Sequence, residues 1–253
     1  MEQAKFSANI GLLWQELPFI ERINRAGEAG FRAVEFHDHA QRECREEVEA
    51  ALDRHGLGLI SLNTFMGDTF GRAAIPGLEP VARKDIDEAI HTAEFLDAQA
   101  IHVLAGCDQS NDAHDVFVRN LEYALTQTDK MILIEPISKS SVHGYFLHSI
   151  SHAGKIIEMI SHPRLKIMFD CFHMRHETND IAKAFEKNLR HIGHVQIASY
   201  PERHEPEDGQ IAYSSLIPSI VRLGYEGWFG CEYFPRDCVE NGLRWMDKFG
   251  TGE

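Results

Sequence analysis

Four short apolar segments in the second half of the chain each end in a side chain that can bind a divalent cation. They are MILIEPI (131–137) with Glu135, LKIMFDCFH (165–173) with Asp170, GHVQIASYPERHEP (193–206) with Gln196, and GWFGCEYFP (227–235) with Glu232. The intervals between these residues are 35, 26 and 36 positions. One strand–helix repeat of a (β/α)₈ barrel has a similar length, about 250 residues divided by eight. The spacing therefore predicts that all four side chains lie at the same end of neighbouring parallel strands.

Charged groups at these positions need a partner. The four strands have the apolar composition of strands that are buried on both faces, and an unpaired carboxylate at the end of such a strand costs free energy. Pairing with Arg or Lys in a structural network would explain one charged strand end. Four ends in step with the repeat favour a metal ion as the common partner.

Apolar, β-rich segments alternate with amphipathic segments of helical length, which is typical of parallel βαβ units. We expect strands near 6–12, 31–36, 57–63, 100–105, 131–136, 165–170, 193–198 and 227–233. Helices are expected over 18–30, 42–56, 82–98, 112–128, 148–161, 178–190, 213–223 and 239–249. Eight strand–helix pairs favour an α/β fold of the (β/α)₈ TIM-barrel type. A doubly wound open sheet is the alternative, but the sequence has no GxGxxG or GxxxxGK[ST] segment for a nucleotide phosphate.

The length of 253 residues fits one such barrel, and no linker rich in Pro, Gly or Ser divides it, so we expect a single domain over 1–253. The first residues lack the long uncharged core of a signal peptide, and no apolar stretch approaches the length of a membrane span. These observations predict a soluble, cytoplasmic protein. The net charge of −14 disfavours nucleic acid and anionic membranes as partners. The expected partner is a small molecule, and a homo-oligomer is possible.

The five cysteines are odd in number and form no CxxC pair, so neither a disulfide framework nor a structural zinc site is indicated. Cys171 and Cys231 adjoin the charged strand ends, but their apolar neighbours predict small buried hydrophobic residues.

Three further polar residues lie on or near the strand ends, where barrel enzymes carry their chemistry. His173 and Arg203 follow the second and third candidate ligands, and both can bind a substrate carboxylate or hydroxyl, Arg203 through a bidentate guanidinium. The alternatives are a backbone-bonded loop histidine and an arginine paired with Glu202 or Glu205. His102, in AIHVLAG, is expected to be buried, either as a core histidine or as a substrate-binding residue.

Three carboxylates and one amide oxygen suit Mg²⁺ or Mn²⁺ better than zinc. Such an ion can chelate adjacent oxygens of a hydroxy-carbonyl substrate and neutralise the enediolate that forms when an α-proton leaves. Glu135 and Glu232 belong to the fifth and eighth expected strands, so one can remove the proton and the other can help to return it. The loop 63–80 is expected to be either a lid or a packing loop, and the charged loop 199–213 to contribute substrate contacts.

At these residues the chain resembles the hydroxypyruvate isomerase family of the xylose-isomerase-like TIM barrels, within the sugar isomerase/epimerase superfamily. The similarity covers SANIGLLWQELPFIERINRAGEAGFRAVEF (7–36), IHVLAG (101–106), ILIEPI (132–137), FDCFHM (169–174), HVQIASYPERHEPEDGQIAY (194–213) and GYEGWFGCEYFP (224–235). The resemblance implies that the four candidate ligands bind the metal, that Glu135 and Glu232 are the acid/base pair, and that His173 and Arg203 face the substrate.

The implied reaction is the interconversion of hydroxypyruvate and 2-hydroxy-3-oxopropanoate (tartronate semialdehyde), an aldose–ketose type proton shift. A 2-oxo-tetronate isomerase, a ketose 3-epimerase and a non-catalytic sugar-acid binding protein are the alternatives. A zinc endonuclease on the same fold is more distant, because it needs more histidine ligands and a basic face. The segments 37–44, 63–80 and 138–146 depart from the family pattern, as does Gln210, which replaces an acidic residue. We expect these loops to decide the substrate.

Overall fold

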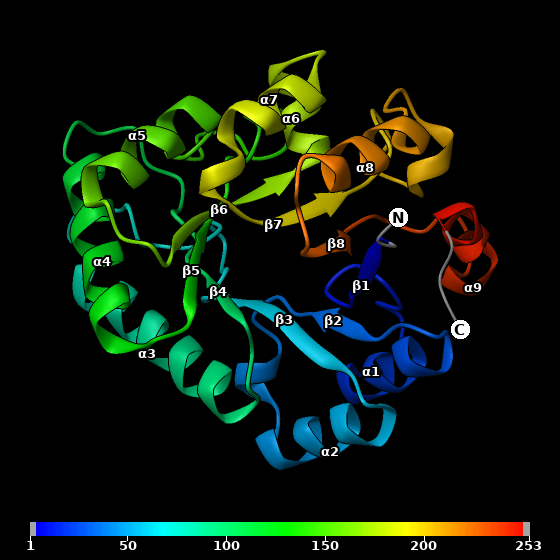
Figure 1. The fold of residues 1–253 in the computed structure, drawn as a ribbon. Coiled ribbons are helices and arrows are strands. Elements are labelled where there is room, and N and C mark those ends of the chain that lie inside the picture. The colour runs from blue at the N-terminus through cyan, green and yellow to red at the C-terminus, as the bar shows by residue number, and fades with distance from the viewer. Residues whose placement is uncertain (1–3, 250–253) are drawn as a thin grey trace.

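Eight short apolar segments pair side by side, in chain order, into a closed parallel barrel (Figure 1). The computed structural model describes residues 4–249. The strands are β1 (Lys5–Asn9), β2 (Ala33–Glu35), β3 (Gly58–Asn63), β4 (Ala100–His102), β5 (Met131–Ile134), β6 (Leu165–Asp170), β7 (Ile192–Ile197) and β8 (Trp228–Cys231). Each expected strand overlaps an observed one, and β1 pairs with β8 to close the barrel. The TIM-barrel prediction is confirmed, and the open-sheet alternative is wrong.

The helices form a ring around the barrel (Figure 1). They are α1 (Phe19–Glu28), α2 (Arg45–His55), α3 (Glu79–Phe95), α4 (Ala113–Gln127), α5 (Ile150–Ile160), α6 (Cys171–Glu177), α7 (Ile181–Asn188), α8 (Tyr213–Arg222) and α9 (Val239–Gly242). Residue-level signals set several of their ends. Pro18 directly precedes α1, and Gly56 ends α2 with a φ of 61°, a left-handed conformation that glycine adopts without strain.

Two expectations for the helices need correction. The sequence predicts a loop after β6 over 171–177, whereas the structure has the short helix α6 there. The helix expected over 239–249 is a single α-turn, α9, followed by a 3₁₀ segment over Leu243–Phe249. In that segment Trp245 packs edge-on against Phe6 of β1, with ring centroids 5.0 Å apart. The tighter helix thus carries an aromatic side chain onto the barrel.

Most buried apolar side chains lie in one continuous core. A second, small cluster joins Ala100, Leu133 and Met168 of the neighbouring strands β4, β5 and β6. Cys171 and Cys231 are fully buried, as the sequence predicts for small hydrophobic residues. Among residues 4–249, no helix combines the length and the apolar composition that crossing a bilayer requires.

The loop 63–80 is hydrogen-bonded to the loop that follows β4. The amide of Ala74 donates to the carbonyl of Ala105 (2.7 Å), and the amide of Cys107 donates to the carbonyl of Thr69 (3.0 Å). An isolated β-bridge joins Gly71 and Ala105. These backbone contacts favour the packing role of this loop over that of a lid.

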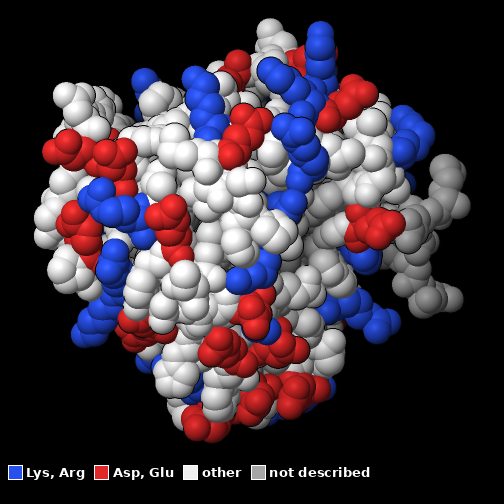
Figure 2. Space-filling view, turned by 60° about the vertical axis from the view of Figure 1, so that its left-hand side comes forward, with Lys and Arg blue, Asp and Glu red and all other residues white. Residues whose placement is uncertain are grey.

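Acidic and basic side chains are interspersed on the molecular face that Figure 2 shows. Asp and Glu gather on the lower part of this face, at the height at which Figure 1 places α2 and α3. The face therefore does not present the continuous basic surface that binding a nucleic-acid backbone requires.

Candidate active site

The four candidate ligands all lie at the carboxyl ends of neighbouring strands. Glu135 directly follows β5, Asp170 ends β6, Gln196 is the penultimate residue of β7, and Glu232 directly follows β8. Their relative exposures of 6%, 1%, 2% and 8% mean that all four are buried. Asp170 also pairs with Gln196 in the β6–β7 register. The barrel therefore places three acidic side chains and one amide at one buried end, as their spacing predicts.

Arg203 lies between two of these carboxylates. Its Nη2 is 3.1 Å from Oδ2 of Asp170 and 2.6 Å from Oε2 of Glu232. The sequence left open a pairing of Arg203 with Glu202 or Glu205. In the structure its guanidinium pairs with Asp170 and Glu232 instead. The side chain also lies over the ring of Phe172, at 5.1 Å from the centroid.

The backbone of Arg203 has a φ of 58°, which is uncommon for a residue with a side chain. Two hydrogen bonds hold it there: its amide donates to the carbonyl of Ser199 (3.0 Å), and its carbonyl accepts from the amide of Phe234 (2.9 Å). The second bond ties the loop after β7 to the loop after β8. Such locally strained residues cluster at functional sites, where the surrounding structure fixes them.

Both oxygens of Glu232 have hydrogen-bond partners. Oε2 accepts from Arg203, while Oε1 lies 3.2 Å from Nε2 of His37 and accepts from Nδ2 of Asn9 (3.3 Å). Burial opposes ionisation of this carboxyl, but the charge of Arg203 and the contact with His37 outweigh it and lower the pKa of Glu232 to about 2. Sequence reasoning missed His37 and Asn9, although both follow or end a barrel strand in the same way as the four ligands.

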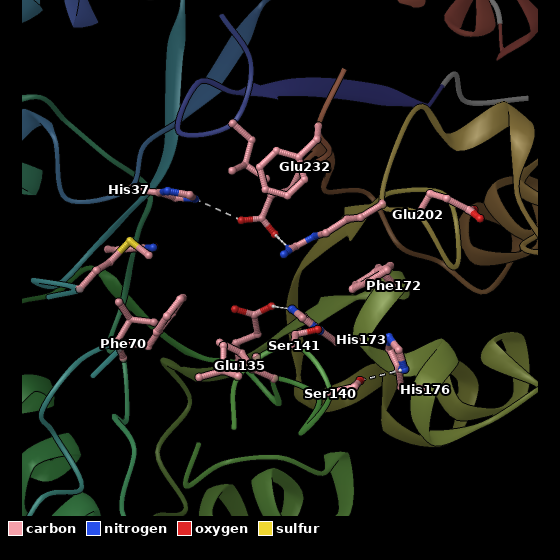
Figure 3. Close-up of a pocket in the computed structure, with 18 of the residues that line it drawn as sticks. His37, Phe70, Glu135, Ser140, Ser141, Phe172, His173, His176, Glu202 and Glu232 are labelled. Atoms are coloured by element: carbon pink, nitrogen blue, oxygen red, sulfur yellow. Dashed lines mark hydrogen bonds and ion pairs between the residues drawn. The ribbon is translucent and has the colours of Figure 1, made fainter. Parts of the chain in front are cut away.

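Glu135 has the opposite environment. Burial and the negative charges of Glu232 and Asp170 raise its pKa well above the usual range. Burial likewise raises the pKa of Asp170 to about 7, although Arg203 opposes the shift. Figure 3 shows the carboxyl groups of Glu135 and Glu232 directed toward one another from opposite sides of the cavity. Two glutamates at one site thus favour different protonation states.

His173 lies in α6, not in a loop, and its ring is buried. The backbone amide of Ser138 donates to Nδ1 (3.4 Å). Because an amide can only donate, Nδ1 must be unprotonated, and the neutral ring carries its proton on Nε2. That nitrogen lies 3.6 Å from Oδ2 of Asp170 and 3.7 Å from Oε1 of Glu135. The alternative of a loop histidine bonded to the backbone is therefore right about the hydrogen bond but wrong about the loop, since His173 lies in a helix.

His102 is also buried at the site. Its Nδ1 is 3.2 Å from Oδ1 of Asn63, and its Nε2 is 3.9 Å from Oε2 of Glu135. Burial is the main cause that lowers the pKa of His102 to about 3, so the ring is neutral at ordinary pH. Burial and the charge of Arg203 also lower the pKa of His173 well below the usual range. Both histidines therefore face Glu135 as neutral rings.

The donor set fits a hard divalent cation. Oε1 of Gln196 and Oε1 of Glu135 are buried and have no hydrogen-bond partner within the described part of the chain. Ligand atoms of Glu135, Asp170 and His173 lie within 4.8 Å of one another. The proton on Nε2 makes His173 a donor toward the carboxylates, so the oxygen atoms are the better ligands. Glu232 lies outside this close group, because its carboxylate is turned to Arg203 and His37.

A cavity of about 680 Å³ opens above these residues (Figure 3). Its apolar wall includes Phe70 and Phe172, and a polar rim carries Ser140, Ser141 and His176. Oγ of Ser140 lies 3.1 Å from Nδ1 of His176. Pockets of this size, apolar with a few convergent polar groups, are typical of small-molecule sites.

Comparison with known proteins identifies the family of this chain. Residues 23–249 match the family described as xylose isomerase-like TIM barrel. The chain belongs to this family. A relative named putative hydroxypyruvate isomerase, from Danio rerio, is 37% identical over 98% of this chain and 96% of its own length. The 2-oxo-tetronate isomerase of Cupriavidus necator is 35% identical over 97% of this chain and 98% of its own length.

A solved structure has nearly the same fold as this chain. The crystal structure described as AP endonuclease, family 2, from Brucella melitensis has a TM-score of 0.93 and 32% sequence identity, and it covers 97% of this chain and 99% of that chain. The resemblance to the hydroxypyruvate isomerases that the sequence motifs indicate is thereby confirmed, and the relatives compared are near-full-length matches.

Proposed function

We propose that this protein is a metal-dependent isomerase of a small hydroxy-oxo acid, with hydroxypyruvate and 2-hydroxy-3-oxopropanoate as the leading pair. The observation that carries the proposal is the pair Glu135 and Glu232, which face one cavity from opposite sides beside buried oxygens that lack a hydrogen-bond partner among residues 4–249. The isomerase names of relatives at 35% and 37% identity support the same reaction class.

We assign Glu135, Asp170, Gln196 and Glu232 as the metal ligands and Mg²⁺ or Mn²⁺ as the ion. When bound, the ion supplies positive charge for the oxygens that become negative as the α-proton leaves. Arg203 is assigned to the substrate carboxylate, and His173 and His102 to substrate oxygens that lie near Glu135.

The two glutamates have complementary tasks. The reaction removes a proton from the hydroxymethyl carbon and delivers one to the neighbouring carbonyl carbon, while the hydroxyl proton passes between the two oxygens. Glu232 can accept the proton from one carbon, and Glu135, on the opposite side of the cavity, can return a proton to the other carbon. In the reverse direction the roles exchange.

A four-carbon 2-oxo-tetronate is the second candidate substrate. The cavity of about 680 Å³ exceeds what a three-carbon acid needs, and Ser140, Ser141 and His176 offer polar contacts for a further hydroxyl group. The relative from Cupriavidus necator is named for this activity. An endonuclease activity is disfavoured by the net charge of −14 and by the interspersed charges of Figure 2.

Metal analysis tests the cofactor. We expect one Mn²⁺ or Mg²⁺ per chain in purified protein, and loss of stoichiometric binding in Asp170→Asn, because one carboxylate ligand becomes a neutral amide. Asp129→Asn is the control, since Asp129 is a fully exposed carboxylate whose ion pair with Arg164 spans 3.8 Å. Unchanged binding by Asp170→Asn would remove Asp170 from the site.

A substrate panel tests the reaction. Hydroxy-oxo compounds of three to six carbons are incubated with metal-replete protein in D₂O and followed by NMR. We expect deuterium incorporation and isomer formation with hydroxypyruvate or with the four-carbon acid. Conversion only of neutral ketoses would indicate a 3-epimerase, and binding without proton exchange would indicate a non-catalytic binding protein.

A further inference from the structure

Glu35 is a buried carboxylate beneath the site that the assigned roles do not use. It ends β2 and has a relative exposure of 1%. Oε1 accepts a hydrogen bond from Oγ of Ser7 (2.5 Å) and lies 3.0 Å from Nε2 of His194. Oε2 accepts from Nε2 of Gln196 (2.9 Å). Because β2 and β7 are not neighbours in the barrel, the contact with Gln196 crosses the barrel interior.

The barrel leaves space for this carboxylate. Gly230 of β8 lies opposite, and a Cβ atom added there would be 2.0 Å from Oε1 of Glu35. The β2–β3 register also shifts between Val34 and Glu35. Irregularities of this kind redirect a side chain and are common next to active sites. The position of Glu35 therefore depends on features of two other strands.

The contact with Glu35 decides how the amide of Gln196 is oriented. An amide offers an oxygen on one side and an NH₂ group on the other, whereas an ionised carboxylate only accepts hydrogen bonds. Nε2 of Gln196 donates to Oε2 of Glu35 (2.9 Å), so the NH₂ group of the amide faces Glu35. Its Oε1 is then directed away from Glu35, buried and without a partner among residues 4–249.

We propose that Glu35 is a positioning residue that fixes Gln196 with its oxygen toward the metal and thereby sets metal affinity. The inference rests on the proposed function, since it takes Gln196 as a ligand. Ser7 donates to the other oxygen of the Glu35 carboxylate, Oε1, and does not contact the oxygen that accepts from Gln196. Without that carboxylate the amide can turn over and present NH₂ to the cation, which an ion does not accept as a ligand.

Two variants of Glu35 separate orientation from charge. Glu35→Gln loses the charge but keeps an oxygen that can accept from Gln196, whereas Glu35→Asp keeps the charge but is one methylene too short to reach. We expect Mn²⁺ affinity, measured by titration with electron paramagnetic resonance of the free ion, to fall about 10- to 100-fold in Glu35→Asp. In Glu35→Gln it should stay within about threefold of wild type, well inside that second-shell range. A purely electrostatic role would give the opposite order.

Ser7→Ala and Gln196→Ala complete the design. Ser7→Ala removes another hydrogen bond to the same carboxylate but leaves the contact with Gln196, so Mn²⁺ affinity should be unchanged even if the metal-free protein melts at a lower temperature. In a Gln196→Ala background, Glu35→Asp and Glu35→Gln should bind Mn²⁺ equally, because no amide remains to be oriented.

A measurement on wild-type protein covers the case in which Glu35→Asp does not fold. The side-chain NH₂ signals of Gln196 are identified in a ¹⁵N spectrum by their absence in Gln196→Ala. We expect one proton to be shifted downfield by its bond to the carboxylate and to stay so when Mg²⁺ is added. Unshifted signals overturn the inference. Equal or stronger Mn²⁺ binding by Glu35→Asp than by Glu35→Gln overturns it too and leaves the proposed function intact, whereas no Mn²⁺ binding by wild type overturns both.

Discussion

At the scale of single residues, the site is defined by contacts that hold similar groups in different states. Oε2 of Glu232 is 2.6 Å from the guanidinium of Arg203, while Oε1 of Glu135 has no hydrogen-bond partner within the described residues. A carboxylate with a pKa of about 2 is a poor proton acceptor. We therefore expect Glu232 to become an effective base when Arg203 moves from it to the carboxylate of a substrate.

Replacing either glutamate by glutamine tests the acid/base assignment. Glu135→Gln and Glu232→Gln keep the volume and one oxygen for the metal but remove the ionisable group, so kcat should fall roughly 10²–10⁴-fold, the usual contribution of general acid–base catalysis. Glu202→Gln is the control, because Figure 3 shows the carboxyl group of Glu202 directed away from the cavity. Near-normal turnover in both site variants, with metal bound, would make His173 the next base to test.

Arg203→Lys tests the role of the guanidinium. Lysine keeps the positive charge but lacks the planar pair of donors. KM for an acid substrate should therefore rise about 10- to 150-fold, which corresponds to the roughly 1.5–3 kcal/mol of a charge-assisted hydrogen bond. A neutral sugar should be affected less. Steady-state kinetics with one substrate of each kind measures the difference. An equal rise of KM for both substrates would indicate that Arg203 only stabilises its loop.

At the scale of helices and strands, the sequence predicts what repeats and misses what is short or tertiary. The barrel strands are found because apolar runs bounded by polar residues recur at one interval. The helix α6 is not predicted, because its seven residues follow β6 without a linker. Its N-cap is also hard to recognise: Asp170 accepts a hydrogen bond from the amide of Phe172 (2.7 Å), but in the sequence the same residue is a candidate metal ligand.

The residues of the site also fall into those that the sequence predicts and those that it does not. The strand ends that carry Glu135 and Glu232 follow from the repeat, so the candidate ligands can be placed from sequence. Glu35 has the same signature, a glutamate in the apolar run FRAVEF, but lies outside the four segments of the second half. That His37 meets Glu232 depends on which side chains face each other across the barrel, and no spacing along the chain encodes that.

The N-terminus of α5 gives a prediction at this scale. Oγ of Ser149 accepts a hydrogen bond from the amide of His152 (3.2 Å) and caps the helix. Ser149→Ala should lower the free energy of unfolding by about 1 kcal/mol, as measured by urea denaturation. The matched control is Ser151→Ala, an exposed position in the first turn of α5, where alanine favours the helix. Equal destabilisation by both variants would argue against the cap.

At the scale of the whole molecule, stability should depend on pH through histidines that the fold keeps neutral. Burial, reinforced by His37 and Arg22, lowers the pKa of His39 to about 4. Its ring stacks on Phe19 at 5.4 Å. Since the unfolded chain, with an ordinary histidine pKa near 6.5, binds more protons in the window between these values, the free energy of unfolding should fall as pH is lowered through it.

His39→Phe keeps the ring on Phe19 and removes the titration. Thermal or urea unfolding between pH 7 and 5 should show a shallower fall for this variant than for wild type, by about 1 kcal/mol after allowance for solvent screening of a half-buried group. His143→Phe at an exposed position is the control. Parallel pH profiles for wild type and His39→Phe would contradict the prediction.

The closed order of the barrel separates two tasks in space. All four candidate ligands lie at the carboxyl ends of β5–β8, whereas Asn63 ends β3, and His37 and Phe70 reach the cavity from the segments that follow β2 and β3. An insertion or exchange in the loops 37–44 and 63–80 therefore leaves the backbone of the ligand strands untouched. A library that varies these two loops but keeps His37, because His37 contacts Glu232, should retain metal binding while it changes substrate preference. The first half of this barrel is therefore the part to recombine when a new substrate is to be accepted.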